Sequence, residues 1–124
     1  MFNRLRHRLR RNFYRAMENN DVTLEQLKQM QNEGATIIDA RSPLEYKEGH
    51  IQGAISLPEY EIRKNINKYI KNQNEKIVLY CQTGHRSKRA QNELLKMGYN
   101  NVFNLYNGLQ NYWDFLLCVL KCEI

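Results

Sequence analysis

The sequence predicts a three-layer α/β domain, with a mostly parallel central sheet flanked by helices. Short apolar runs alternate with segments of helical periodicity through most of the chain, as in repeated units of strand, helix and strand. The run from Ile77 to Tyr80 is apolar at every position, which is typical of a strand buried on both faces of a parallel sheet. The 124 residues are enough for one domain that buries its own core.

A basic arm, residues 1–18, is expected to precede this domain, which then occupies residues 19–124. Residues 1–15 contain six arginines and no acidic residue. Of the 19 basic residues, 19 minus 6 leaves 13 in the rest of the chain, where all 13 acidic residues lie. The charge of +6 therefore belongs to the arm, which argues against a nucleic-acid-binding surface on the domain.

The arm itself has the pattern of an amphipathic helix, with Phe2, Leu5, Leu9 and Phe13 on one face and arginines on the other. Two interpretations stay open. In one, residues 1–17 make peripheral contact with an anionic membrane surface or an acidic partner. In the other, the apolar face packs on the domain and the arginines are simply solvated.

The expected elements in the first half of the domain are a helix at 23–32, strands at 36–40 and 54–57, and a helix at 59–70. Thr23 is the expected N-cap of the first helix, Gln26 its capping-box partner and Gly34 the residue that ends it. Pro58 stops the second strand because proline has no N–H to donate to a neighbouring strand. The apolar face of the helix that follows is expected to carry Ile62, Ile66, Tyr69 and Ile70.

The expected elements in the second half are a strand at 77–80, a helix at 87–97, a strand at 101–105 and an apolar helix at 108–120. No apolar run is long enough to cross a bilayer. The three cysteines, Cys81, Cys118 and Cys122, do not form a disulfide framework, and the arginine-rich start lacks the apolar region of a secretory signal. A reducing cytoplasm is therefore the expected compartment.

The turn after strand 77–80 carries the main candidate for chemistry, Cys81. It lies between a buried strand and the start of a helix, where unpaired backbone N–H groups and the helix dipole favour negative charge on sulfur. His85 and Arg86 add positive charge, and Gly84 lets the backbone curl around the thiol. A buried, inert cysteine is the alternative, but a polar and cationic turn favours a nucleophile.

A second group of polar residues lies at the end of strand 36–40, namely Asp39 and Arg41. The carboxyl ends of parallel strands meet at one edge of a sheet, so we expect both residues to share that edge with Cys81. Asp39 and Arg41 are predicted to form a structural ion pair. Contact between Arg41 and a substrate anion is the alternative.

Three segments of the sequence resemble the rhodanese family of sulfurtransferases in its single-domain form. They are Asp39 to Ile55 with its Gly49-His50-Ile51 stretch, the loop Cys81-Gln82-Thr83-Gly84-His85-Arg86-Ser87, and Gly98 to Trp113. The resemblance covers roughly residues 22–116. One departure is Asn107-Gly108, where relatives often have two glycines, and asparagine tolerates the positive φ that such a turn requires.

The resemblance implies a sulfurtransferase in which Cys81 attacks the outer sulfur of thiosulfate or a similar donor and keeps it as a persulfide. A thiol, a thiol-carrying protein or cyanide then accepts that sulfur. Arg86 would hold the loop and attract the donor's sulfonate. The other expected substrate-binding residues are Gln82, Thr83, Gly84, His85, Ser87 and Arg41. No metal or organic cofactor is expected.

Two other functions are weighed against this one. Phosphatases and arsenate reductases of the same fold place five residues between cysteine and arginine, whereas four lie between Cys81 and Arg86, which makes a smaller loop. The non-enzyme alternative is an interaction module that carries persulfide without efficient turnover. His50 is interpreted as a structural histidine rather than a base. Cys118 and Cys122 lack the partners for a zinc site, although Cys122 could take part in redox chemistry.

Overall fold

The computed structural model describes residues 17, 18, 20–112, 120 and 121 of the chain. Most of the predicted arm therefore lies outside the described residues, as do Cys118 and Cys122. Within the described part, none of the helices combines the length and the apolar composition needed to cross a membrane.

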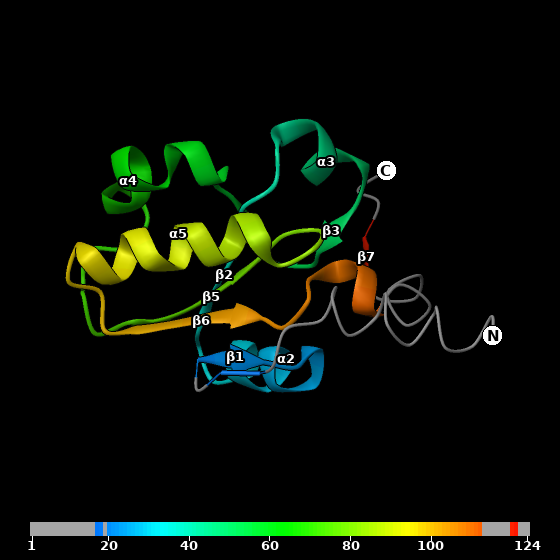
Figure 1. The fold of residues 1–124 in the computed structure, drawn as a ribbon, viewed down its shortest axis with the longest axis horizontal. Helices are drawn as coiled ribbons and strands as arrows, with labels where there is room; N and C mark the ends of the chain where they lie inside the picture. The colour runs from blue at the N-terminus through cyan, green and yellow to red at the C-terminus, as the bar shows by residue number, and fades with distance from the viewer. Residues whose placement is uncertain (1–16, 19, 113–119, 122–124) are drawn as a thin grey trace, which may run out of the picture.

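A five-stranded sheet forms the centre of the domain (Figure 1). Its strands are β1 (Asp21–Val22), β2 (Thr36–Asp39), β4 (Ile55–Ser56), β5 (Lys76–Tyr80) and β6 (Asn101–Leu105). They lie in the order β1-β6-β5-β2-β4, and each neighbouring pair is parallel. The prediction of a mostly parallel sheet is therefore confirmed, with the apolar strand β5 at its centre.

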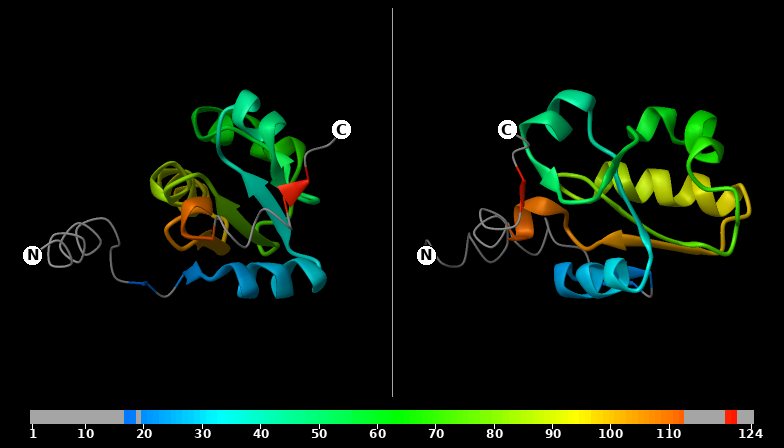
Figure 2. Two further views of the ribbon diagram at one scale, coloured as in Figure 1. Left: turned by 90° about the vertical axis from the view of Figure 1, so that its right-hand side faces the viewer. Right: turned by 180° about the vertical axis from the view of Figure 1, so that it is seen from behind.

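Helices cover both faces of this sheet, which gives the three predicted layers (Figures 1 and 2). Helix α2 (Leu24–Asn32) covers one face, and α4 (Ile62–Asn65) and α5 (His85–Lys96) cover the other. Successive strand residues point to opposite faces, so Ile37 belongs to the core under α2 and Ile38 to the core under α4 and α5. The sheet thus separates two apolar cores.

Helix α2 begins as predicted. The Thr23 side chain accepts from the backbone N–H of Gln26, and the Gln26 side chain accepts from the backbone N–H of Thr23. A second capping box, which the sequence analysis did not identify, starts the short helix α3 (Pro43–Glu48). There Ser42 is the N-cap, Pro43 the first helical residue and Glu45 the partner.

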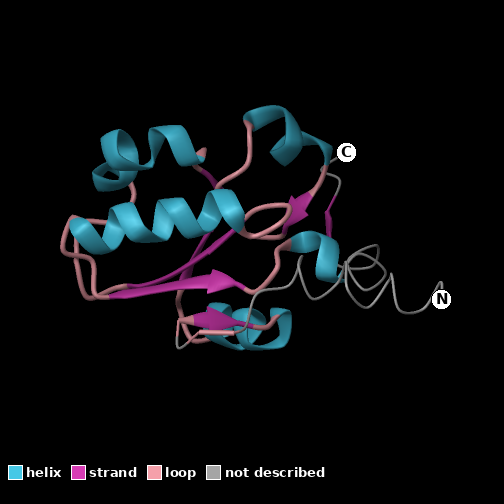
Figure 3. Cartoon of the chain, viewed as in Figure 1, coloured by secondary structure: helices cyan, strands magenta, loops and turns pink. Residues whose placement is uncertain are grey.

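The expected helix at 59–70 is present as three short helical segments. Figure 3 draws this part of the chain as helix, beside α5. A 3₁₀ turn (Glu59–Glu61) precedes α4, and another (Ile66–Lys68) follows it. Ile62, Ile66 and Ile70 are buried as predicted, whereas Tyr69, which was expected on the same face, is 49% exposed. Short 3₁₀ turns are common at the ends of α-helices, and periodicity alone does not distinguish the two. Helix α5 begins at His85, two residues before the predicted start.

The predicted helix at 108–120 is wrong at both ends that the structure describes. Residues Leu109–Tyr112 form a 3₁₀ helix, and β7 (Leu120–Lys121) pairs antiparallel with β3 (His50–Ile51). Figure 1 places this small sheet at the same end of the molecule as α3. A short apolar run fits a strand and a helix equally well. Residues 120 and 121 form a strand because they pair with the distant strand β3. Residues 113–119 lie outside the described part of the chain.

Candidate active site

Cys81 follows the last residue of β5 and is fully buried. Its Sγ atom accepts three hydrogen bonds, from the backbone N–H of Gly84 at 3.1 Å and from the backbone N–H and the hydroxyl of Ser87 at 3.4 and 3.3 Å. Gly84 has a φ of 92°, a left-handed conformation that turns its N–H toward the sulfur. Three convergent donors stabilise negative charge on Sγ, as the position at a helix start predicts.

The turn after β6 supports the loop that carries Cys81, residues 81–87, which we name the thiol loop. The backbone N–H of Leu109 donates to the carbonyl of Cys81 at 3.0 Å, and that of Gln110 donates to the carbonyl of Gln82 at 3.1 Å. Asn107 and Gly108 have φ values of 58° and 70°, so the expectation that asparagine tolerates this turn is confirmed. These contacts hold both carbonyl groups of the loop in place.

Arg86 points to Glu45 of α3. Its Nη1 and Nη2 atoms donate to the two carboxylate oxygens at 2.7 and 3.0 Å. The hydrogen bonds from Arg86 hold the pKa of Glu45 down to about 2, helped by those from Ser42. The same pairing raises the pKa of Arg86, to which the nearby Cys81 also contributes. The pair ties α3 to the first turn of α5, directly beside the thiol loop.

Arg41 and Asp39 form the predicted ion pair at the carboxyl edge of the sheet. Both are buried, and Arg41 Nη2 donates to Asp39 at 2.7 Å and to the carbonyl of Gly49 at 2.6 Å. Burial alone would lower the pKa of Arg41, but its hydrogen bond to Asp39 and the carboxylate charge more than offset that effect, so the pKa is raised. This pairing favours a structural role for Arg41 over contact with a substrate anion.

The two histidines of this region differ in their surroundings. His50 is buried, its Nδ1 lies 2.8 Å from the carbonyl oxygen of Tyr46, and its ring stacks on the Tyr46 ring. The prediction of a structural, hydrogen-bonded His50 is confirmed. His85 is exposed and lies 3.0 Å from the hydroxyl of Thr83, at the solvent side of the loop. Gln82 is half-buried, like Thr83.

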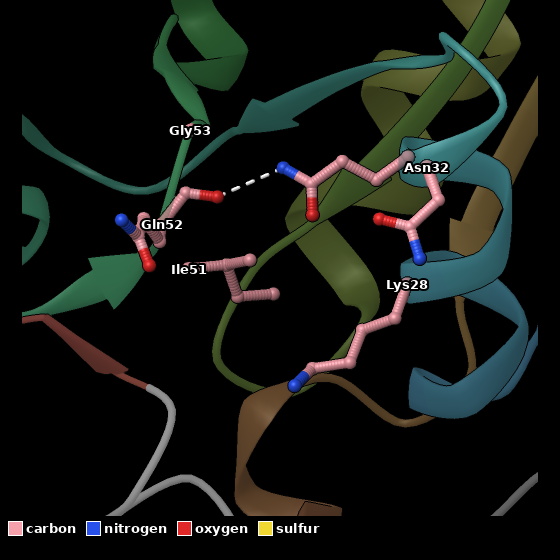
Figure 4. A pocket seen from close by; sticks show the side chains of 6 residues that line it. Lys28, Asn32, Ile51, Gln52 and Gly53 are labelled. Atoms are coloured by element: carbon pink, nitrogen blue, oxygen red, sulfur yellow. Dashed lines mark hydrogen bonds between the residues drawn. The ribbon is translucent and has the colours of Figure 1, made fainter.

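A pocket of about 470 Å³ opens between α2 and the β3–β4 connection (Figure 4). Lys28 and Asn32 reach into it from the helix, opposite Gln52, and Gln31 Nε2 donates to the Gln52 carbonyl at 2.8 Å. None of its lining residues belongs to the Cys81 loop. Among the described residues there is also no group of three or more His, Cys, Asp or Glu side chains that could hold a metal ion.

Glu45 is the site residue to which the sequence analysis assigned no role. Its signal was present in the Ser42-Pro43-Leu44-Glu45 pattern, a capping box with proline at the first helical position. That pattern predicts a helix start but not the partner of the carboxylate. Arg86 lies 41 positions away in sequence, and only the fold brings the two together.

A thiol that accepts hydrogen bonds from backbone amides, at the carboxyl edge of a parallel sheet, is an arrangement suited to a nucleophilic cysteine in an α/β protein. The chain belongs to the rhodanese family, since the family model of the rhodanese-like domain matches residues 23–114.

Individual relatives agree with this family. The chain is 32% identical over 114 residues to a Bacillus subtilis protein named as a sulfur carrier, YrkF, with 87% of this chain and 60% of YrkF covered. It is 37% identical over 67 residues to the thiosulfate sulfurtransferase PspE of Escherichia coli, with 54% of this chain and 64% of PspE covered. The chain thus spans less than two thirds of either relative.

A solved structure, a rhodanese with anions from E. coli, is also similar to this chain. The TM-score is 0.57 and the sequence identity 34%, with 59% of this chain and 86% of that one covered. The prediction of a rhodanese-like α/β fold is therefore confirmed.

Proposed function

We propose that this protein is a sulfurtransferase that carries sulfane sulfur as a persulfide on Cys81. The observation that carries the proposal is the convergence of the Gly84 N–H, the Ser87 N–H and the Ser87 hydroxyl on Sγ. A sulfur atom that must alternate between thiolate and persulfide needs fixed donors for its negative charge, and an inert core thiol does not. The names of YrkF and PspE, a sulfur carrier and a thiosulfate sulfurtransferase, support this chemistry.

The reaction has two steps, both of which exchange one S–S bond for another. The Cys81 thiolate attacks the outer sulfur of thiosulfate, the S–S bond of the donor breaks, and sulfite leaves with the electron pair. A thiolate acceptor, free or on a protein, then attacks the outer sulfur of the Cys81 persulfide and releases the Cys81 thiolate. No oxidant or reductant is needed.

The loop residues have separate parts in this proposal. The backbone of Gln82 to Ser87 cradles the outer sulfur, with Thr83 and His85 at the solvent side, where donor and acceptor arrive. Arg86 holds the loop through Glu45. Arg41 stabilises the carboxyl edge of the sheet through its ion pair with Asp39. The four-residue spacing between Cys81 and Arg86 disfavours a phosphatase or an arsenate reductase.

The protein treated with thiosulfate should gain the mass of one sulfur atom and should pass that sulfur to cyanide. Cys81→Ser is expected to remove both properties while leaving the fold intact, because serine is nearly isosteric with cysteine. Intact-mass spectrometry and a sulfur-transfer assay provide the measurement. Cys118→Ser and Cys122→Ser are matched controls that make the same change at the other two cysteines.

The outcomes distinguish the alternatives. Added sulfur that persists in Cys81→Ser would contradict the proposal. A persulfide on the wild type with negligible turnover would instead favour the interaction module that carries sulfur for a partner.

The basic arm, residues 1–18, remains a predicted recruitment segment ahead of the domain at 19–124, with peripheral membrane contact in the cytoplasm as its proposed use.

A further inference from the structure

The arginine nearest to the reactive thiol is already engaged by a carboxylate. Arg86 presents its two terminal nitrogens to both oxygens of Glu45, at 2.7 and 3.0 Å, in the two-pronged geometry that gives the strongest arginine pairs. About a third of each side chain is exposed, so the pair is within reach of solvent beside the Cys81 loop.

Glu45 is itself held in place. Its Oε1 accepts from the backbone N–H of Ser42 at 3.1 Å and from the Ser42 hydroxyl at 3.0 Å, as part of the capping box of α3. For Glu45 to release Arg86 by swinging away, the capping box of α3 would lose the hydrogen bonds that Ser42 donates to the carboxylate. The carboxylate is therefore a fixed competitor for the guanidinium.

The charges at this edge of the sheet balance in pairs. Arg86 faces Glu45, and Arg41 faces Asp39. Thiosulfate carries two negative charges, and an anion approaching Arg86 meets the Glu45 carboxylate beside it. The two like charges repel each other, and the Glu45 carboxylate already neutralises most of the positive charge of Arg86. A donor with one negative charge or none escapes most of this repulsion.

We propose that Glu45 is a specificity-determining residue, which withholds Arg86 from dianionic donors and so favours persulfides of small uncharged thiols over thiosulfate. The inference rests on the proposed sulfur transfer through Cys81. In the favoured reaction, the Cys81 thiolate attacks the outer sulfur of RS–SH, a new S–S bond forms, and RS⁻ leaves with the electron pair of the old bond. The proton stays with the transferred sulfur or passes to RS⁻.

The test compares two donors on Glu45→Gln. Glutamine keeps the capping box, because its side-chain oxygen still accepts from Ser42, but it removes the charge that neutralises Arg86. The ratio of kcat/KM for thiosulfate to kcat/KM for the persulfide of 2-mercaptoethanol should rise about tenfold, the low end of electrostatic steering. The gain should shrink at high ionic strength, a response that loss of a purely structural contact would not produce.

Glu93→Gln is the matched control. Glu93 lies near the other end of α5, the helix that carries Arg86, and pairs with Arg63 and Lys96, so the variant removes the same charge from an ion pair without touching Glu45 or Arg86. The donor ratio of Glu93→Gln should equal that of the wild type. A second measurement needs no variant: wild-type kcat/KM for thiosulfate should change less than about twofold between ~0.05 and ~0.5 M salt.

An unchanged or lower donor ratio in folded Glu45→Gln would overturn the inference, as would a steep salt dependence of the wild type with thiosulfate. Either result leaves the proposed function standing as long as Cys81 gains sulfur. If the wild type gained sulfur from neither donor, that result would instead contradict the proposed function itself. Thermal unfolding of each variant shows that the comparison is made between folded proteins.

Discussion

At the scale of single residues, the charge on Glu45 links the site to the stability of the domain. Its pKa is held at about 2 by the hydrogen bonds from Arg86, well below the ordinary value of 4.5. A carboxyl group whose pKa is depressed by folding binds fewer protons in the folded state than in the unfolded state. Stability from this pair is therefore complete above the ordinary pKa and is lost as the pH falls toward about 2.

This linkage predicts a difference between the wild type and Glu45→Gln in acid. Between about pH 5 and about pH 2, the wild type should lose ~1 kcal/mol more free energy of unfolding than the variant, a value reduced for solvent screening of a pair that is one third exposed. Urea unfolding at several pH values measures it. Parallel pH profiles for the two proteins would show that folding does not depress the pKa of Glu45.

Single residues also show where sequence reasoning stopped. Cys81, the helix start and the supporting Gly84 follow from local pattern, because strand end, turn and helix are contiguous in the chain. The direction in which the Arg86 side chain points does not follow from local pattern. A sequence gives the sign of a side chain's charge, but the carboxylate that takes that charge comes from another element.

At the scale of elements, the turn at Asn107-Gly108 is as important to the thiol loop as the loop's own residues. A Cβ atom on Gly108 would lie 2.5 Å from the carbonyl oxygen of Gln82 and 2.7 Å from that of Cys81. Both neighbours are backbone atoms, which cannot move aside as a flexible side chain could. The loop therefore keeps its shape only with glycine below it.

Gly108→Ala and Gly34→Ala form a matched pair that separates backbone strain from steric clash. Both glycines have positive φ, but a Cβ on Gly34 would meet nothing within 4 Å. Gly34→Ala should lower the free energy of unfolding by ~1 kcal/mol and leave sulfur transfer unchanged. Gly108→Ala should lower sulfur transfer more than about tenfold, since displacement of a positioned group weakens catalysis steeply. Normal activity in Gly108→Ala would contradict the supporting role of the turn.

Elements with a local signature were predictable, and those defined by distant partners were not. Strand β6 has its predicted bounds, and the cap of α2 is the predicted one. The two-residue strands β1, β3 and β7 were missed, because their identity depends on pairing with other strands rather than on an apolar run. The six-residue helix α3 has no fully buried side chain, so it produces no apolar periodicity.

At the scale of the whole molecule, the sheet keeps the two cores apart. Ile37 packs with the core under α2, and Ile62 with the core under α4 and α5. Ile37→Val and Ile62→Val should each lower the free energy of unfolding by ~1 kcal/mol. The double variant should equal the sum within ~0.5 kcal/mol, because the two side chains share no partner. Chemical denaturation of the three variants measures this, and a deviation above ~1 kcal/mol would contradict independent cores.

The three-layer arrangement was predictable at this scale because alternation of apolar segments is a property of the whole sequence. Periodicity could not predict how the site is assembled. There α3, α5 and the turn after β6 come together around the Cys81 loop.

The hydrogen bonds from Leu109 and Gln110 to the thiol loop also set an order of events during synthesis. Cys81 and the whole of α5 are synthesised before these two donors, and a domain generally folds as a unit. A nascent chain that ends after β6 holds every residue of the loop but lacks the amides that anchor its carbonyls. The carbonyls of Cys81 and Gln82 are thus anchored only once the segment that follows β6 has been made.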